Sequence, residues 1–301
     1  MSIRLSDIRQ HIRLELLAKQ LVEGFITGLH KSPYHGFSVE FAEHRLYNEG
    51  ESVRHIDWKV YARTDRLFTK QYEEETNLRC LIAVDTSSSM FYPSGTRSKI
   101  NFSLYAAAAL AYLLQRQRDA VGLCQFGDRI VQLTAVKSTP THLEKIFAIL
   151  ENVRQQESGT PKTNVTKVLH EIAEKIHKRS LVVLFSDMFD GQESADELFK
   201  SLQHLKHNKH EVIVFHVMDN RTELYFEFDD KPTEFIDLES GARVKLNPAS
   251  VKSEYRTNVA TFHKSLKLHC NRFKIDFVEV DVQKDFNLIL QTYLIKRSKM
   301  S

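Results

Sequence analysis

The most informative stretch of this 301-residue chain is LIAVDTSSSM, residues 81–90. Its four leading apolar residues predict a buried strand, and Asp85 stands where that strand ends. Two hydroxyl side chains follow at alternate positions, Ser87 and Ser89. In an open α/β sheet, ligands bind just beyond the carboxyl ends of the strands. A carboxylate and two serines there would form an all-oxygen surface suited to a hard divalent cation. Taken alone, the decapeptide favours a helix N-cap, because Ser and Asp also begin helices.

Two later segments change that balance in favour of a metal site. Residues 181–187, LVVLFSD, predict a second buried strand that ends in a carboxylate, Asp187. Residues 159–165, GTPKTNV, form a loop that leads into a helix with one apolar face, from Val165 to Ile176. The chain therefore offers a hydroxyl-bearing loop and two strand-terminal carboxylates.

These three segments resemble the von Willebrand factor A-type domain and its metal-ion-dependent adhesion site. That site combines an Asp-x-Ser-x-Ser run, a Thr from a Thr-Asn loop, and an Asp that closes a later strand. The resemblance implies that Mg²⁺ or Mn²⁺ is bound by Asp85, Ser87, Ser89, Thr163 and Asp187. The loop reads Pro-Lys-Thr-Asn where the family usually has Gly-Gly-Thr-Asn, so Thr160 is a rival to Thr163.

From residue 78 onward, predicted strands and helices alternate, which predicts a mostly parallel sheet covered on both faces. The fold class is therefore α/β, doubly wound and Rossmann-type. Residues 121–126 and 130–133 are joined by so short a connection that one must be an antiparallel edge strand. Within this domain of residues 78–301, we expect a β-rich insertion near 221–246, with short strands at 225–228 and 235–238.

Residues 1–77 do not follow the alternation and predict a separate appendage of mixed α and β structure. A helix is expected near 8–29, and a charged, aromatic stretch follows it. This stretch resembles the signature of the bacterial DUF58 family, in which it precedes a von Willebrand A-like domain, and the resemblance covers roughly residues 34–281. Gly50-Glu51-Ser52 stands where members often have Gly-Asp-Asp. The signature's charged residues could form an ion-pair network around Trp58.

Alternatively, the signature could be a partner-docking face, because Trp and Arg are favoured anchors in interfaces. Its candidate residues are Arg45, Arg54, Asp57, Trp58 and Arg63.

Composition limits the remaining classes. With 42% hydrophobic and 27% charged residues and a net charge of +3, nothing points to nucleic acid or a membrane surface. The three cysteines, Cys80, Cys124 and Cys270, lack metal-type spacing and predict reduced thiols. We find no signal-peptide pattern and no apolar run long enough for a membrane span, so we expect a cytoplasmic protein. The histidines at 204, 207 and 210 predict a solvated helix end.

The expected function is binding rather than catalysis. Haloacid dehalogenase phosphatases use Asp-x-Asp, whereas Ser87 here could not act as the general acid. DUF58 proteins are commonly encoded beside MoxR-type AAA+ ATPases, so the resemblance implies an adaptor that binds such an ATPase or a client protein. A metal-dependent phosphohydrolase using Asp85 is the alternative, and a structural domain with a vestigial site is a third.

Overall fold

The computed structural model describes residues 13–30, 44–46, 61–63, 66, 68–70, 78–160, 164–177, 179–188, 195–284 and 287–300. The chain divides into two compact units. One comprises Met1–Phe25 with Leu78–Met300, and the other comprises Ile26–Asn77 with Ser301. In the second unit, β1 (His44–Leu46) pairs antiparallel with β2 (Phe68–Lys70).

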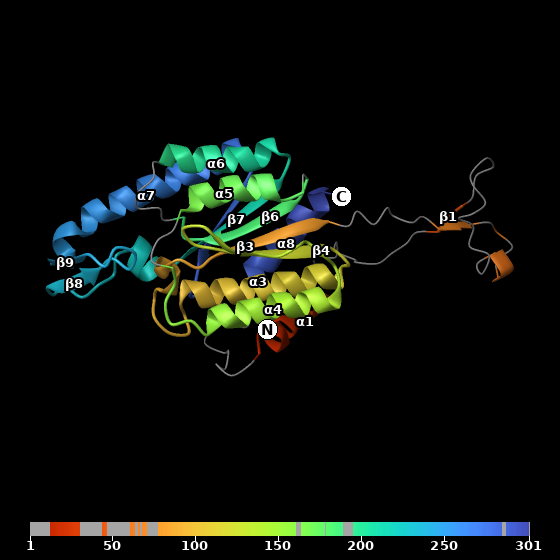
Figure 1. The fold of residues 1–301 in the computed structure, drawn as a ribbon, viewed down its shortest axis with the longest axis horizontal. Helices are drawn as coiled ribbons and strands as arrows, with labels where there is room; N and C mark the ends of the chain where they lie inside the picture. The colour runs from red at the N-terminus through yellow and green to blue at the C-terminus, as the bar shows by residue number, and fades with distance from the viewer. Residues whose placement is uncertain are drawn as a thin grey trace. The chain divides into compact units, whose positions relative to one another are not determined.

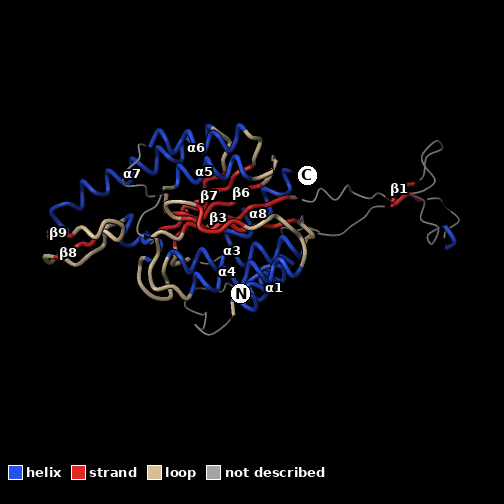
Figure 2. Tube along the Cα trace, in the orientation of Figure 1, coloured by secondary structure: helices blue, strands red, loops and turns tan. Residues whose placement is uncertain are grey.

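The first unit is built on a six-stranded sheet, visible edge-on in Figures 1 and 2. Its strands in spatial order are β10 (Asp276–Asp281), β7 (Glu211–Met218), β6 (Leu181–Ser186), β3 (Arg79–Asp85), β4 (Ala120–Phe126) and β5 (Ile130–Leu133). All neighbours are parallel except β4 and β5, which are antiparallel. The predicted α/β class, mostly parallel with one antiparallel edge strand, is confirmed.

The strand order identifies where a ligand would bind. Numbered in chain order, the strands run 3-2-1-4-5-6 across the sheet, which is the doubly wound order. The order reverses between β3 and β6, which pair in register from Cys80 with Leu181 to Val84 with Phe185. Such a switch point leaves a crevice outside the carboxyl ends of the two strands.

Helices cover both faces of the sheet (Figure 1). On one face lie α5 (Val165–Lys175) and α6 (Ala195–His207), with α7 (Pro248–Arg272) beside them; α3 (Lys99–Arg116) and α4 (Pro140–Arg154) lie on the other. The chain also forms α1 (Leu14–His30) and α8 (Asn287–Met300). The β6 strand is buried along its whole length, as expected for a parallel strand covered on both sides.

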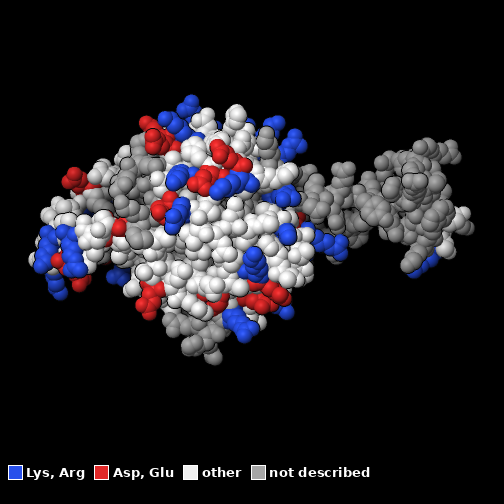
Figure 3. Space-filling view, in the orientation of Figure 1, with Lys and Arg blue, Asp and Glu red and all other residues white. Residues whose placement is uncertain are grey.

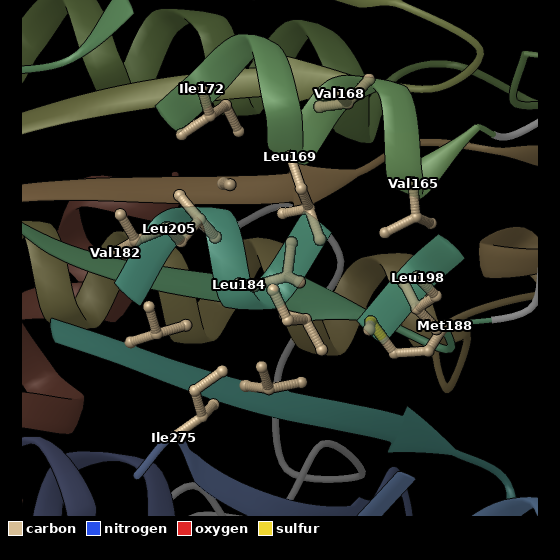
Figure 4. Close-up of a cluster of buried hydrophobic side chains, with 14 of the residues drawn as sticks. Val165, Val168, Leu169, Ile172, Val182, Leu184, Met188, Leu198, Leu205 and Ile275 are labelled. Atoms are coloured by element: carbon tan, nitrogen blue, oxygen red, sulfur yellow. The ribbon is translucent and has the colours of Figure 1, made fainter. Parts of the chain in front are cut away.

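The core under α5 and α6 shows why these segments fold as they do. Val165, Val168, Leu169 and Ile172 recur at helical spacing and are all fully buried. Figure 4 shows them pointing at the sheet, where Leu184 of β6 meets them. The free thiols Cys80, Cys124 and Cys270 are buried too, which agrees with the predicted reduced cysteines.

Two local predictions differ from the structure, and one long helix was not predicted. Residues 225–228 do not form the predicted strand, because Phe226 has a left-handed backbone (φ 49°) and turns its ring into an aromatic cluster. The insertion instead contains the π-helix η4 (Asn220–Leu224) and a hairpin of β8 (Thr233–Ile236) with β9 (Arg243–Leu246). The long helix α7 was not expected. His210 is buried rather than solvated and accepts a hydrogen bond from the Ser180 amide.

Candidate functional site

Two carboxylates from neighbouring strands stand at the switch point. Asp85 is the last residue of β3 and is fully buried, whereas Asp187 directly follows β6 and is 5% exposed. Parallel strands bring their carboxyl ends to the same edge of the sheet, so strand pairing alone brings these two residues close together. The two side chains are close enough for the negative charge of Asp187 to raise the pKa of Asp85.

The loop after β3 folds back on Asp85. The Ser87 amide donates a hydrogen bond to Asp85 Oδ1 at 2.9 Å, and the Ser87 and Ser89 hydroxyl oxygens lie 3.1 Å apart. Ser89 belongs to the short 3-10 helix η3 (Ser88–Phe91). The alternate spacing seen in the sequence therefore brings two hydroxyls together beside a carboxylate.

The second strand fixes the other side of Asp85. Ser186, the last residue of β6, donates its hydroxyl hydrogen to Asp85 Oδ2 at 2.7 Å. The Met188 amide in turn donates to the Ser186 hydroxyl oxygen at 2.9 Å. Both carboxylate oxygens of Asp85 are thus held by the protein, which fixes this side chain as an anchor of the site.

A third loop approaches the same place. Residues Ser87 and Thr160 form an isolated parallel bridge, and the Ser88 amide donates to the Thr160 carbonyl at 2.9 Å. Gly159 makes this approach possible, because a Cβ there would lie 2.4 Å from the Thr86 carbonyl oxygen. The Thr160 hydroxyl is directed at the Thr86 carbonyl oxygen, 3.5 Å away.

Thr163, the predicted hydroxyl ligand of this loop, lies outside the residues that the structure describes, so its role stays a prediction. The helix that follows, α5, begins at Val165, and Asn164 caps it by accepting a hydrogen bond from the Lys167 amide at 2.7 Å.

The site also contains a buried lysine that the sequence interpretation missed. Lys99, the first residue of α3, is 1% exposed, and its ammonium nitrogen lies 2.8 Å from Asp187 Oδ2. The same nitrogen pairs with Glu223 of η4, which is 24% exposed. One sequence signal could have indicated it, because a cation in the first turn of a helix opposes the helix dipole and so suggests another partner.

The charges at the site are strongly coupled. Burial, together with the negative charge of Asp187, raises the pKa of Asp85 to about 7. Burial lowers the pKa of Lys99, but the carboxylates of Asp187 and Glu223 outweigh it and hold that pKa above its ordinary value. Asp187 and Glu223 therefore share one ammonium group, and Asp187 also acts on the charge of Asp85.

A buried histidine completes the surroundings of Asp187. His216 of β7 donates from Nε2 to the Asp187 carbonyl oxygen at 2.9 Å, because a carbonyl can only accept. Burial and the neighbouring His263 lower the pKa of His216 to about 3, so its ring is neutral near pH 7. It positions the Asp187 backbone and adds no charge to the site.

The described residues fit a hard divalent cation by donor chemistry and by charge. Asp85, Ser87, Ser89 and Asp187 present oxygen atoms, the ligands such ions prefer. With all groups ionised, three carboxylates and Lys99 leave two net negative charges. Among the described residues, no group of three or more His, Cys, Asp or Glu side chains is arranged to hold a metal ion. Serine hydroxyls and water would therefore have to supply part of the coordination.

The predicted docking residues of the signature lie largely beyond the described part of the chain. Arg54, Asp57 and Trp58 are outside it. Arg45 lies in β1 opposite Thr69, and Arg63 lies exposed in a short helical segment at 61–63. The proposed network around Trp58 and the alternative of a docking face both stay predictions.

Uncharacterized proteins of Mycobacterium bovis and Mycobacterium tuberculosis are 24% identical to this chain over 208 residues, 69% of this chain and 64% of theirs. The chain thus spans about 64% of the length of these curated relatives. BatB from Bacteroides thetaiotaomicron superposes with a TM-score of 0.47 at 13% identity, covering 74% of this chain and 99% of BatB. The SpRpn10 VWA domain gives 0.41 at 10% identity, covering 71% and 94%.

None of the helices among the described residues combines the length and apolarity needed to cross a bilayer. The family profile described as "Protein of unknown function DUF58" matches residues 43–265, which is more than half of the chain. The chain therefore belongs to the DUF58 family.

Proposed function

We propose that this protein is a non-enzymatic interaction module that binds a partner protein at the carboxyl edge of its sheet, in a Mg²⁺- or Mn²⁺-dependent way. The observation that carries the proposal is the gathering of Asp85, Ser87, Ser89 and Asp187 at the switch point between β3 and β6. These residues would hold the ion, with Thr163 as a further candidate. A bound ion would supply a positive charge that attracts a carboxylate of the partner.

Binding is favoured over hydrolysis by the state of Asp85. A phosphatase of the Asp-x-Asp type needs a carboxylate free to attack phosphorus and a second one to donate a proton. Here Asp85 is fully buried with both oxygens engaged, and the second position is Ser87. Among the described residues, positions 85 and 87 thus do not provide the accessible nucleophile and the acid that this mechanism needs.

We further propose that the partner is a MoxR-type AAA+ ATPase or one of its client proteins, and that the complex forms in the cytoplasm. The support is the family assignment, together with the neighbourhood in which DUF58 proteins are commonly encoded. Positive and negative side chains are interspersed on the face drawn in Figure 3, which favours a protein partner over nucleic acid.

Binding of the purified full chain to the MoxR-type ATPase of the same organism tests the proposal, measured in Mg²⁺ and in EDTA. Chelation should weaken binding about thirtyfold or more, because losing a charge-assisted anchor costs ~2–5 kcal/mol. Ser89→Ala should also weaken binding of the ATPase in Mg²⁺, without unfolding the chain. Ser88→Ala is the matched control, since its hydroxyl is directed at the Thr160 carbonyl.

Equal dissociation constants in Mg²⁺ and EDTA would refute the metal-dependent part of the proposal. Hydrolysis of p-nitrophenyl phosphate that survives purification and disappears in Asp85→Asn would favour the phosphohydrolase instead.

A further inference from the structure

A wide groove opens beside the candidate metal site. Ser89 and Asp187 form one end of it, and it extends between α7 and the β8–β9 insertion. Its volume is about 1010 Å³, enough for several side chains of a bound peptide. The insertion therefore adds a second surface to the edge of the sheet where the metal would bind.

One wall of the groove is an aromatic cluster. The Phe226 ring lies 4.4 Å from that of Tyr255 on α7 and 4.9 Å from that of Phe228. Phe228 meets Phe235 of β8 edge to face at 5.0 Å. Because the rings support one another, the wall is a preformed apolar surface.

Apolar side chains also stand open to solvent along the groove. Ile236 is 47% exposed and Leu238 is 49% exposed, and both line it. Two large aliphatic residues exposed beside an aromatic wall make a continuous apolar patch, which in a folded protein commonly marks a binding surface.

The charged groups of the groove are of one sign. Its lining contains the carboxylates Asp187, Glu223, Glu234, Asp237 and Glu239. Among the described residues, no lysine or arginine lines the groove.

Part of this negative charge is offset and part is not. Lys99, which does not line the groove, pairs with Asp187 and Glu223, and Arg243 lies 3.5 Å from Glu234. Hydrogen bonds from the Ser240 hydroxyl and the Glu239 amide lower the pKa of Asp237, so it is ionised at neutral pH. Basic and acidic side chains occur together around β8 and β9 (Figure 3), but Arg243 and Lys245 of β9 do not line the groove.

From this combination we infer that the groove binds an extended segment of a partner protein in which lysine or arginine stands beside apolar side chains. The carboxylates would accept charge-assisted hydrogen bonds from the basic residues. The aromatic faces would take the apolar residues and could also contact the cations. An acidic segment would be repelled. This inference goes beyond the proposed function, because the groove requires no metal.

Selection of random dodecapeptides displayed on phage against the immobilised full chain tests it without assuming a sequence. Enriched peptides should contain Lys or Arg next to aromatic or aliphatic residues. Binding of a synthetic enriched peptide should fall at least tenfold in Ile236→Ser and Leu238→Ser. The matched controls are Ile295→Ser and Leu288→Ser on α8, which are 47% and 45% exposed and do not line the groove.

The charge of the groove is tested by Asp237→Asn with Glu234→Gln, which should reduce the preference for basic peptides while apolar binding persists. Binding of the enriched peptide should persist in EDTA, where no divalent cation is available, so failure of the metal proposal would not affect this result. No enrichment, enrichment of acidic peptides, or equal binding by the groove and control variants would each overturn the inference.

Discussion

Lys99→Met tests the most unexpected part of the site. Methionine keeps the length and apolar stem of the side chain but removes the charge. Lys99 is 1% exposed and its nitrogen lies 2.8 Å from Asp187 Oδ2, so the substitution leaves two carboxylates, Asp187 and Glu223, without their cation. Removing one partner of a buried ion pair typically costs ~3–5 kcal/mol. At ~2–4 °C per kcal/mol, we expect the melting temperature in EDTA to fall by roughly 6–20 °C.

Chemical denaturation and thermal melting in EDTA measure the loss of stability in Lys99→Met. The control is a Lys→Met substitution in an exposed ion pair. Lys175 is 53% exposed and lies 2.9 Å from Glu171 one helical turn away. An exposed pair of this kind contributes ~0.3–0.5 kcal/mol, so Lys175→Met should barely change stability. Equal effects of the two substitutions would show that Lys99 is not a structural cation.

Mg²⁺ supplies the second part of the test. The Lys99→Met variant carries one more net negative charge at the site, so it should bind Mg²⁺ more tightly than the wild type does. Two unit charges ~5 Å apart interact by ~3 kcal/mol at an effective dielectric constant of ~20, which makes a tenfold or larger gain reasonable. If Mg²⁺ stabilises the variant no more than the wild type, the ion does not bind beside Asp187.

Two further predictions concern pH and the approach of the loops. The pKa of Asp85 is raised to about 7, so the folded chain binds a proton on this carboxylate more tightly than the unfolded chain does. The free energy of unfolding in EDTA should therefore fall as the pH rises from ~4 to ~7. Denaturation curves of Asp85→Asn should lack this pH dependence. Mg²⁺ needs the ionised carboxylate, so the increase in stability that Mg²⁺ produces should instead grow as the pH rises over the same range. Gly159→Ala should lower the free energy of unfolding by ~1–3 kcal/mol or more, because the added methyl group would overpack against Thr86. Gly24→Ala in α1 is the control: no atom lies within 4 Å of the added methyl group, so the change should be neutral or stabilising by ~0.5–1 kcal/mol.

The sequence was sufficient to predict the sheet and the two strand-terminal carboxylates. A buried parallel strand reads as an uninterrupted apolar run, so the residues before Asp85 and Asp187 identify both β3 and β6 and their carboxyl ends. The short connection after Phe126 likewise identified the antiparallel edge. In each case the signal is local, because a few consecutive residues carry it.

What the sequence did not predict depends on contacts between distant residues. Lys99 lies 88 positions before Asp187 and 124 before Glu223, so its unfavourable place in the first turn of a helix could suggest a partner but could not identify these two carboxylates. The segment at 225–228 alternates as a strand would, yet packing of Phe226 against Tyr255 on α7 overrides that pattern. Tertiary packing routinely overrides such local preferences.

The Lys99 ammonium group suggests how the proposed module could respond to loss of its metal ion. Without an ion, Asp85 is held by Ser87 and Ser186, and Asp187 is held by Lys99, so each carboxylate already has partners from the chain. Removing the ion should therefore lower the affinity for a carboxylate-bearing partner without unfolding the domain. Since Lys99 is paired with Asp187 and Glu223 together, a partner that displaces Glu223 would change the charge next to Asp187. Binding in the groove, which Glu223 also lines, would in that way be coupled to the affinity of the site for its cation.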